Sequence, residues 1–205
     1  MSFFDRNRKD LAARGIDPAR LPPGQYSTER FPVLHVGSTP RYKDLSTYDL
    51  KVFGEVERPF TLTLAELVAQ PAQEVTTDIH CVTKWSKFDT RWKGVPIAAL
   101  LDRAGVKPEG THLMFHCEQG YTTNVPLADV RAPHVALLAY EFEGEPLEPD
   151  HGYPLRSFVP HLYLWKSAKW IRGIEVMAGD RPGFWERNGY HMYGDPFLEQ
   201  RFWGD

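Results

Sequence analysis

Apolar runs of strand length recur along this chain at irregular intervals, without the regular alternation of strands and helices that a doubly wound sheet requires. The segments between the runs carry signals for short helices only. The pattern therefore predicts an α+β fold with irregular mixed sheets. We expect its strands at residues 48–53, 75–81, 112–117, 135–140, 152–159 and 170–177, with a turn opening the fifth.

Two of the intervening segments carry signals that start and stop a helix. Thr63 and Glu66 form a capping box, which predicts a short helix that ends before Pro71. A proline directly precedes residues 97–104, where it suits the first turn of a second helix, and Gly105 lies just beyond its end. Both helices would connect neighbouring strands.

The two ends of the chain are expected to be irregular. Residues 1–45 are rich in proline, glycine and charge, which favours an extended arm along the surface with one short helix near residues 10–14. The segment from Asp180 onward has the composition of a surface loop. The first ten residues lack both the apolar stretch of a secretory signal and a twin-arginine pair.

Composition excludes several classes of function. The chain has 205 residues, enough for one ordinary domain, and its net charge of -3 offers no basic field that would attract nucleic acid. No segment approaches the roughly 20 apolar residues that a membrane-spanning helix needs. The two cysteines form neither a disulfide framework nor a CxxC motif. We therefore expect a cytoplasmic protein.

Cys81 carries the strongest chemical signal. It lies beside His80 and close to Lys84, and nearby cations can lower the pKa of a thiol and favour the thiolate that attacks electrophiles or binds soft metals. As a nucleophile it would need a base. Adjacent strand residues point to opposite faces, so His80 is a poor partner, and His116 or His151 would have to serve. The alternative is that Cys81 is a small buried apolar residue.

A zinc site is not favoured, because the eight histidines are scattered along the chain. His112 and His116 lie four residues apart, but they fall in an expected strand, where this spacing spans about 13 Å. Two side chains so far apart cannot share one metal ion.

A group of cations offers a different kind of site. His151, Arg156, Lys166 and Lys169 lie on turns flanking one expected strand, where they could cradle an anion together with backbone N–H groups of residues 167–168. The alternative is a set of solvated loops with ordinary salt bridges. A large anionic cofactor would account both for this cluster and for an aromatic content of 13%, which suits a pocket for a partly planar ligand.

Three blocks of the sequence place cysteine, tryptophan and basic residues in a distinctive order. They comprise Cys81, Trp85, Trp92, Gly94-Val95-Pro96 and Leu100-Leu101; Leu138 to Glu141, Gly144, Leu147, Asp150 to Arg156 and Val159-Pro160; and Lys166 to Ile174 with Trp185 to Tyr190. In order and spacing they resemble the molybdopterin-binding domain of the sulfite oxidase family. The first block is especially similar to the methionine-sulfoxide reductase branch, and the second to the sulfite oxidases proper.

The resemblance implies a sulfite-oxidase-type fold over residues 31–193, with residues 1–30 as an N-terminal arm and residues 194–205 as a tail. It implies a molybdenum–molybdopterin cofactor and no haem. Cys81 would be the thiolate ligand to molybdenum, which agrees with the softness of sulfur, and Tyr190 would be the active-site tyrosine. Contacts to the pterin and its anionic tail are implied for His35, Cys117, His151, Arg156, Ser167, Ala168 and Lys169.

Departures from the family pattern concern the substrate more than the cofactor. Sulfite oxidases have arginines around a small anion pocket, and this chain has Ser86 and Val33 at two of those positions. Losing two guanidinium groups removes bidentate recognition of an oxyanion. Lys84, Lys87 or Arg91 could supply a different cationic wall. The family's C-terminal dimerisation domain is not found in this sequence.

The resemblance implies oxygen-atom transfer to or from a small sulfur- or nitrogen-centred substrate. Reduction of S-oxides or N-oxides is favoured, and electrons would come from or go to an external partner, for example a cytochrome, since no second redox centre is found. Two alternatives stay open. One is a cofactor-free binding module that retains the fold, and the other is a sulfite-oxidising enzyme with an altered anion pocket.

Overall fold

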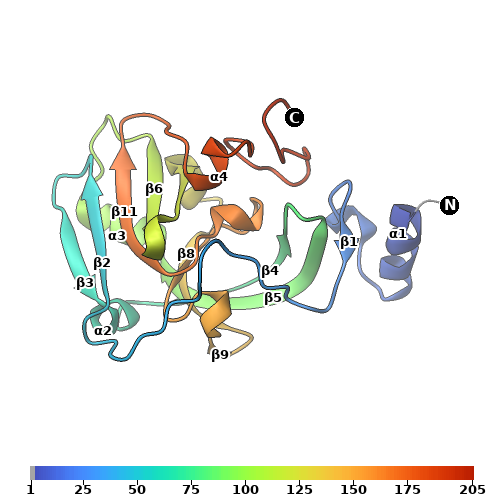
Figure 1. The fold of residues 1–205 in the computed structure, drawn as a ribbon, viewed down its shortest axis with the longest axis horizontal. Helices are drawn as coiled ribbons and strands as arrows, with labels where there is room; N and C mark the ends of the chain where they lie inside the picture. Colours follow the sequence, from blue (N-terminus) through green and yellow to red (C-terminus); the bar gives the residue numbers. More distant parts are fainter. Residues whose placement is uncertain (1–2) are drawn as a thin grey trace.

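Two β-sheets form the framework of the protein in the computed structural model, which describes residues 3–205 (Figure 1). Residues 1 and 2, the start of the predicted arm, lie outside the described residues. The first sheet is built around β5, which pairs in parallel with β1 and antiparallel with β4 and β8. Its strands are β1 (Tyr26–Ser27), β4 (Gln73–His80), β5 (Trp85–Pro96), β8 (Leu137–Phe142), β9 (Glu145–Pro146) and β10 (Arg156–Phe158).

The second sheet holds most of the large core. Its order is β3-β2-β11-β6-β7, with β2 and β11 parallel and the other pairs antiparallel. Val52, Ile174 and Phe115 lie side by side across three of these strands, and all three are fully buried. The strands are β2 (Asp49–Gly54), β3 (Phe60–Thr63), β6 (His112–Cys117), β7 (Thr122–Pro126) and β11 (Ile171–Met177).

The helices between the strands are short. The capping box of Thr63 and Glu66 forms and starts α2 (Leu64–Val68). The helix predicted over residues 97–104 is α3 (Ile97–Ala104), and Gly105 follows it with a φ of 68°, a left-handed conformation that glycine adopts without strain. The helix expected near residues 10–14 is the end of a longer one, α1 (Phe3–Ala13), because no proline or glycine interrupts the chain before it. The fourth helix, α4 (Phe184–Arg187), was expected to be loop.

The mixed pairing confirms the predicted α+β fold, but the sequence did not predict β5, the longest strand. Backbone irregularities explain this. Asp89 has a φ of 53°, and the register of β5 against β8 shifts after Lys93, so the inside–outside alternation that identifies a strand is interrupted. The strand β7 was also missed.

Hydrogen bonds from the arm and from the tail meet at the turn that carries Cys81. The Gln25 side chain donates to the Cys81 carbonyl at 3.0 Å. From the tail, Arg201 donates to the carbonyls of Val82 and Pro23 at 3.2 and 3.1 Å. Both ends of the chain therefore hold this turn in place, while the predicted boundaries at residues 30 and 193 stay predictions. Within residues 3–205, each helix is too short or too polar to cross a membrane.

Candidate functional site

A cavity of about 350 Å³ is bounded by the N-terminal arm, the turn after β4, the segment before β11 and the residues around α4. It brings together seven of the nine predicted site residues from distant parts of the chain. These are His35, Cys81, Arg156, Ser167, Ala168, Lys169 and Tyr190.

Cys81 lies in a tight turn directly after β4. Its N–H donates to the Trp85 carbonyl at 2.9 Å, its carbonyl accepts from the Lys84 N–H at 3.0 Å, and its Sγ lies 3.1 Å from Thr83 Oγ1. Burial raises the pKa of the Cys81 thiol, and the hydrogen bond with Thr83 opposes this only in part. The expected net lowering of this pKa is therefore wrong for the protein alone, because burial outweighs the charges of Lys169 and Arg201, which do lower it.

His80 points away from the thiol, as the strand alternation predicts. Its Nδ1 lies 2.8 Å from Ser86 Oγ, and its ring meets that of Phe197 edge to face. Burial lowers the pKa of His80 to about 4, so its imidazole is neutral near pH 7. His80 therefore does not serve as a base for the Cys81 thiol.

Arg156 is a buried cation whose hydrogen bonds go to neutral backbone groups. Its guanidinium donates to the carbonyls of His151 at 2.9 Å and Ser167 at 2.7 Å, and it lies over the Trp92 ring, 5.3 Å from the centroid. Among the side chains that the structure describes, no carboxylate pairs with it, and burial lowers the pKa of Arg156 to about 10. The carbonyls stabilise the charge without neutralising it.

Lys169 adds a second cation to the same wall. Its Nζ donates to the carbonyls of Leu34 at 3.0 Å and Asp150 at 2.5 Å, which ties the arm to the turn before β10. Burial and the charge of Arg156 lower the pKa of Lys169 to about 7. An anion in the cavity would favour the protonated form of this amine.

The turn of Ser167 and Ala168 lines the cavity, but its N–H groups already have partners. The Ser167 N–H donates to the Leu164 carbonyl at 3.0 Å, and the Ala168 N–H donates to Ser157 Oγ at 2.7 Å. Ser167 Oγ accepts from the Val159 N–H at 2.9 Å. The expected cradle of backbone donors is therefore wrong for these two N–H groups.

The two histidines assigned to the cofactor differ in position. His35 lines the cavity with its ring edge-on to Trp170, 5.2 Å between centroids. His151 lies behind the wall, stacked on Phe31 at 3.9 Å, and its buried Nδ1 has no hydrogen-bond partner. Burial lowers the pKa of His151 to about 4, which makes it neutral near pH 7.

Cys117, the last residue of β6, does not line the cavity. It is buried within the main core, and its N–H donates to the Tyr121 carbonyl at 2.9 Å. Burial holds the pKa of the Cys117 thiol well above its usual range. Of the two cysteines, only Cys81 presents its thiol to the cavity.

Tyr190 lines the cavity as part of an aromatic cluster. Its ring stacks on Trp185 at 4.8 Å and meets Trp165 and Phe202 edge to face. Burial, with a smaller contribution from the charge of Cys81, raises the pKa of the Tyr190 phenol. The hydroxyl is therefore a proton donor at neutral pH, in the same cavity as the thiol.

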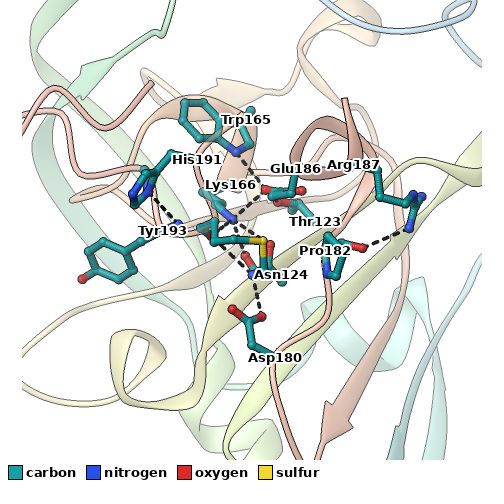
Figure 2. A network of polar contacts seen from close by, with 12 residues as sticks. Thr123, Asn124, Trp165, Lys166, Asp180, Pro182, Glu186, Arg187, His191 and Tyr193 are labelled. Carbon is teal, nitrogen blue, oxygen red and sulfur yellow. Dashed lines mark hydrogen bonds and ion pairs between the residues drawn. The ribbon is translucent and has the colours of Figure 1, made fainter. Parts of the chain in front are cut away.

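Lys166, expected in the anion cradle, belongs instead to a buried polar network (Figure 2). Its Nζ lies 2.6 Å from Glu186 Oε1 and 2.8 Å from Asn124 Oδ1, and both charged side chains are fully buried. The same carboxylate oxygen accepts from Trp165 Nε1 at 2.9 Å. The expectation that Lys166 faces the anion is wrong, because its charge is neutralised internally and the pair instead fixes Trp165.

Several aromatic residues of the cavity wall were not predicted as site residues, among them Phe31, Trp85 and Trp165. Trp85 Nε1 is buried without a hydrogen-bond partner. The aromatic content of the sequence indicated a pocket for a planar ligand, but not which rings would form it.

The three basic residues expected to replace the arginines of the anion pocket do not form a cationic wall at the cavity. Lys84 is exposed, Lys87 donates to the Glu29 carbonyl at 2.8 Å, and Arg91 donates to the Glu143 carbonyl at 3.2 Å. None of these three residues lines the cavity.

The fold has a counterpart among solved structures. The sulfane dehydrogenase SoxCD from Paracoccus pantotrophus superposes with a TM-score of 0.66 over 77% of this chain and 44% of that one, at 24% sequence identity. The arrangement of mixed sheets with few short helices is thus of the type found in that protein.

The sequence identifies the family. Residues 36–185 match the family described as "Oxidoreductase molybdopterin binding domain". The uncharacterized oxidoreductase YuiH of Bacillus subtilis is 51% identical over 91% of this chain and 93% of its own length. Chicken sulfite oxidase is 31% identical over 71% of this chain and 38% of its own length. This chain belongs to the sulfite oxidase family of molybdopterin-binding oxidoreductase domains.

Relatives with a named substrate are longer than this chain. The methionine-sulfoxide reductase catalytic subunit MsrP of Gluconobacter oxydans is 31% identical over 72% of this chain, which spans 52% of that protein. The corresponding share of chicken sulfite oxidase is smaller still. The relationship therefore establishes the oxidoreductase domain and not the activity of either whole protein.

Proposed function

We propose that this protein is a molybdenum–molybdopterin oxidoreductase that transfers an oxygen atom to or from a small sulfur- or nitrogen-centred substrate. One observation carries the proposal. Within residues 3–205, the Arg156 guanidinium has no carboxylate partner and lies buried in the wall of a cavity that Cys81 also lines. A buried cation without a counter-charge is costly, and an anionic cofactor would supply that charge.

The residues present fit such a cofactor. The cavity of about 350 Å³ falls within the usual range of ligand pockets, and its aromatic wall suits a planar ring system. The Trp85 Nε1–H is a buried donor that lacks an acceptor. Cys81 would hold the metal, because a thiolate is a soft ligand, and Arg156 and Lys169 would bind the anionic tail.

The other residues predicted to contact the cofactor differ in their position relative to the cavity. Ser167, Ala168 and His35 would line the bound cofactor, and His151 would support the wall from behind through Phe31. Cys117 is assigned no contact with the cofactor, because it lies in the core away from the cavity lining.

When bound, the cofactor supplies two-electron redox chemistry and oxygen-atom exchange. The protein's own part is to bind it, control the proton on Cys81 and shield the site. The raised pKa keeps the thiol protonated until a metal displaces the proton. The Tyr190 hydroxyl, whose pKa is also raised, would donate a hydrogen bond to an oxygen of the substrate.

The cavity wall beside the thiol favours a neutral substrate. Val82 and Thr83 flank Cys81 there, and neither Ser86 nor Val33, which replace arginines of the sulfite oxidases, lines the cavity. Without guanidinium groups at these positions, a doubly charged oxyanion loses its bidentate partners. We therefore favour reduction of an S-oxide or N-oxide over oxidation of sulfite, with electrons supplied by an external partner such as a cytochrome in the cytoplasm.

Cofactor content after replacement of each cysteine tests the proposal. We expect about one molybdenum and one pterin per chain in protein from a molybdenum-replete host, and loss of most of the molybdenum in Cys81→Ser. Cys117→Ser is the matched control, because this thiol is buried outside the cavity, and it should keep its molybdenum. Metal-free wild-type protein would reject the enzyme and favour the binding-module alternative.

Tyr190→Phe separates chemistry from cofactor binding. The substitution keeps the ring that stacks on Trp185 and removes only the hydroxyl. We expect a fall in turnover of about a hundredfold or more, the range for losing one donor at a reacting oxygen, with molybdenum content unchanged. Turnover would be compared on sulfite, sulfoxides and N-oxides with artificial electron donors and acceptors. Equal loss of turnover and molybdenum would mean that Tyr190 is structural.

A further inference from the structure

Two histidines and one aspartate meet outside the cavity, at a position to which nothing in the proposed function assigns a role. Asp129, His134 and His161 place one ligand atom each within 4.8 Å of one another. Asp129 lies in a short helical turn after β7, and the two histidines come from the loops before β8 and after β10. Three loops therefore converge on one carboxylate.

The polar atoms of this cluster are buried without hydrogen-bond partners. Asp129 is only 6% exposed, and its Oδ2 accepts no hydrogen bond. Both ring nitrogens of His161 are likewise buried and unpaired. Such groups are costly to bury, so a carboxylate oxygen and an imidazole left without partners in one cluster indicate a missing ligand.

Direct hydrogen bonds do not hold the three side chains together. His161 Nε2 lies 3.4 Å and His134 Nε2 lies 3.9 Å from the same Asp129 Oδ1, and neither contact is a hydrogen bond. The two rings are stacked 4.0 Å apart, and the Nε2 atom of each approaches the same Asp129 oxygen. Tyr193 donates to Asp129 Oδ1 at 3.2 Å and fixes the orientation of that carboxylate.

The distances between these ligand atoms match a shared metal ion better than a hydrogen bond. Ligand atoms about 2.0–2.1 Å from a tetrahedral zinc lie roughly 3.3 Å from one another. The His161–Asp129 separation of 3.4 Å is already close to that value, and a small rotation of His134 would bring in the third ligand. Two imidazoles and one carboxylate are ligands that bind first-row divalent metals and leave an open position.

We propose that Asp129, His134 and His161 form a second metal site, which binds a divalent first-row transition metal such as Zn²⁺. The site is independent of the molybdenum cofactor. Bound metal would join the loop of His134 to the loop of His161. The latter leads directly into Leu164 and Trp165, which line the cavity, so the metal would also stiffen that wall.

The absorption spectrum of bound Co²⁺ distinguishes metal binding at this site from metal binding by a cysteine thiolate. Protein as purified, with its cofactor, would be dialysed against a chelator and titrated with Co²⁺ while the absorption spectrum is recorded. We expect one equivalent to bind with d–d bands and without a thiolate-to-cobalt charge-transfer band. Competition with Zn²⁺ would then bleach the spectrum, because zinc binds the same ligands more tightly.

Variants locate the ion. His161→Gln should weaken Co²⁺ binding at least tenfold, and Asp129→Asn, which is nearly isosteric, tests the same ligand set should the first variant fold poorly. The matched control is His112→Gln. His112 is exposed to the same extent as His161, at 24% of the side chain, and lies 3.9 Å from the Asp180 carboxylate but has no third ligand. It should bind Co²⁺ like the wild type.

Three results would overturn the site. One is wild-type protein that binds no Co²⁺ at tenfold molar excess. Another is a charge-transfer band that places the ion on a thiolate. The last is a cobalt affinity that neither His161→Gln nor Asp129→Asn lowers. Raised thermal stability with Zn²⁺ in the wild type and the His112→Gln control, absent in Asp129→Asn, would support the proposed bridge between loops.

Discussion

Lys166 and Arg156 are two buried cations with opposite solutions to the same problem. Lys166 lies against Glu186 at 2.6 Å with both side chains fully buried, and the network around them holds Trp165 (Figure 2). Arg156 is buried to the same degree, but its donors meet only backbone carbonyls. One charge is balanced by the chain itself, and the other is not.

The difference indicates what each residue is for. A neutralised pair contributes rigidity and places no demand on a ligand. An uncompensated cation in a cavity wall lowers the stability of the empty protein and raises its affinity for an anion. The comparison therefore predicts that Lys166 acts mainly on folding, and Arg156 mainly on cofactor binding.

The largest expected effect is on stability. Lys166→Met leaves Glu186 as a buried charge without its partner, which should lower the free energy of unfolding by about 3–5 kcal/mol. Urea denaturation followed by tryptophan fluorescence measures it. In the double variant Lys166→Met/Glu186→Gln the loss should be smaller than the sum of the single losses. Additive losses would show that the ion pair is not the source of the coupling.

A smaller effect is expected for Arg156→Met in the cofactor-free protein. Loss of the hydrogen bonds to two carbonyls is offset by removal of an unpaired charge, so stability should change by less than about 2 kcal/mol. Affinity for the cofactor should fall more than tenfold, because a charge-assisted hydrogen bond contributes about 1.5–3 kcal/mol. Pterin and molybdenum content per folded chain measures this.

The contrast between the two variants is the control. If Lys166→Met retains cofactor in its folded fraction while Arg156→Met loses it, the two cations have separate roles. If Arg156→Met instead unfolds the protein as strongly as Lys166→Met, Arg156 is a structural residue and the main support for the anionic cofactor fails.

The sequence could identify the chemical groups of the site more readily than their partners. The structure brings Cys81, Arg156 and Lys169 to one cavity, and a thiol and two cations within a recurring order of residues are visible in sequence. The neutralisation of Lys166 was not visible, since Glu186 lies twenty residues further on and meets it only through tertiary packing.

The same limit applies to the fold. Local signals located α2 and α3, because a capping box and a left-handed glycine act within one helical turn. They could not locate β5, whose alternation of buried and exposed side chains is interrupted at Asp89. Nor could they show that the Ala168 N–H donates to the Ser157 hydroxyl of β10. Contacts between distant segments decide which of the polar groups stay free for a ligand.

The most gradual effect concerns Lys169, because it is spread over several pH units. Its pKa is about 7 in the folded protein against 10.5 ordinarily, so the folded state holds fewer protons than the unfolded state between these values. Below pH 7 the amine is charged in both states and its burial costs most. Stability of the cofactor-free protein should therefore rise from pH 7 toward pH 10, by at most about 1.4 kcal/mol per pH unit from this group.

Cofactor binding should remove this rise, because a bound anion favours the protonated amine and brings its pKa back toward 10.5. Unfolding of cofactor-free and cofactor-loaded protein at pH 7 and pH 9 measures the difference, and Lys169→Met should make the two pH profiles parallel. A rise that persists in the loaded protein would mean that the anion does not reach Lys169. Of the two cations Arg156 and Lys169, only Arg156 would then be left to bind the anionic cofactor. The proposed division between a cofactor-binding cation and the structural cation Lys166 would depend on Arg156 alone.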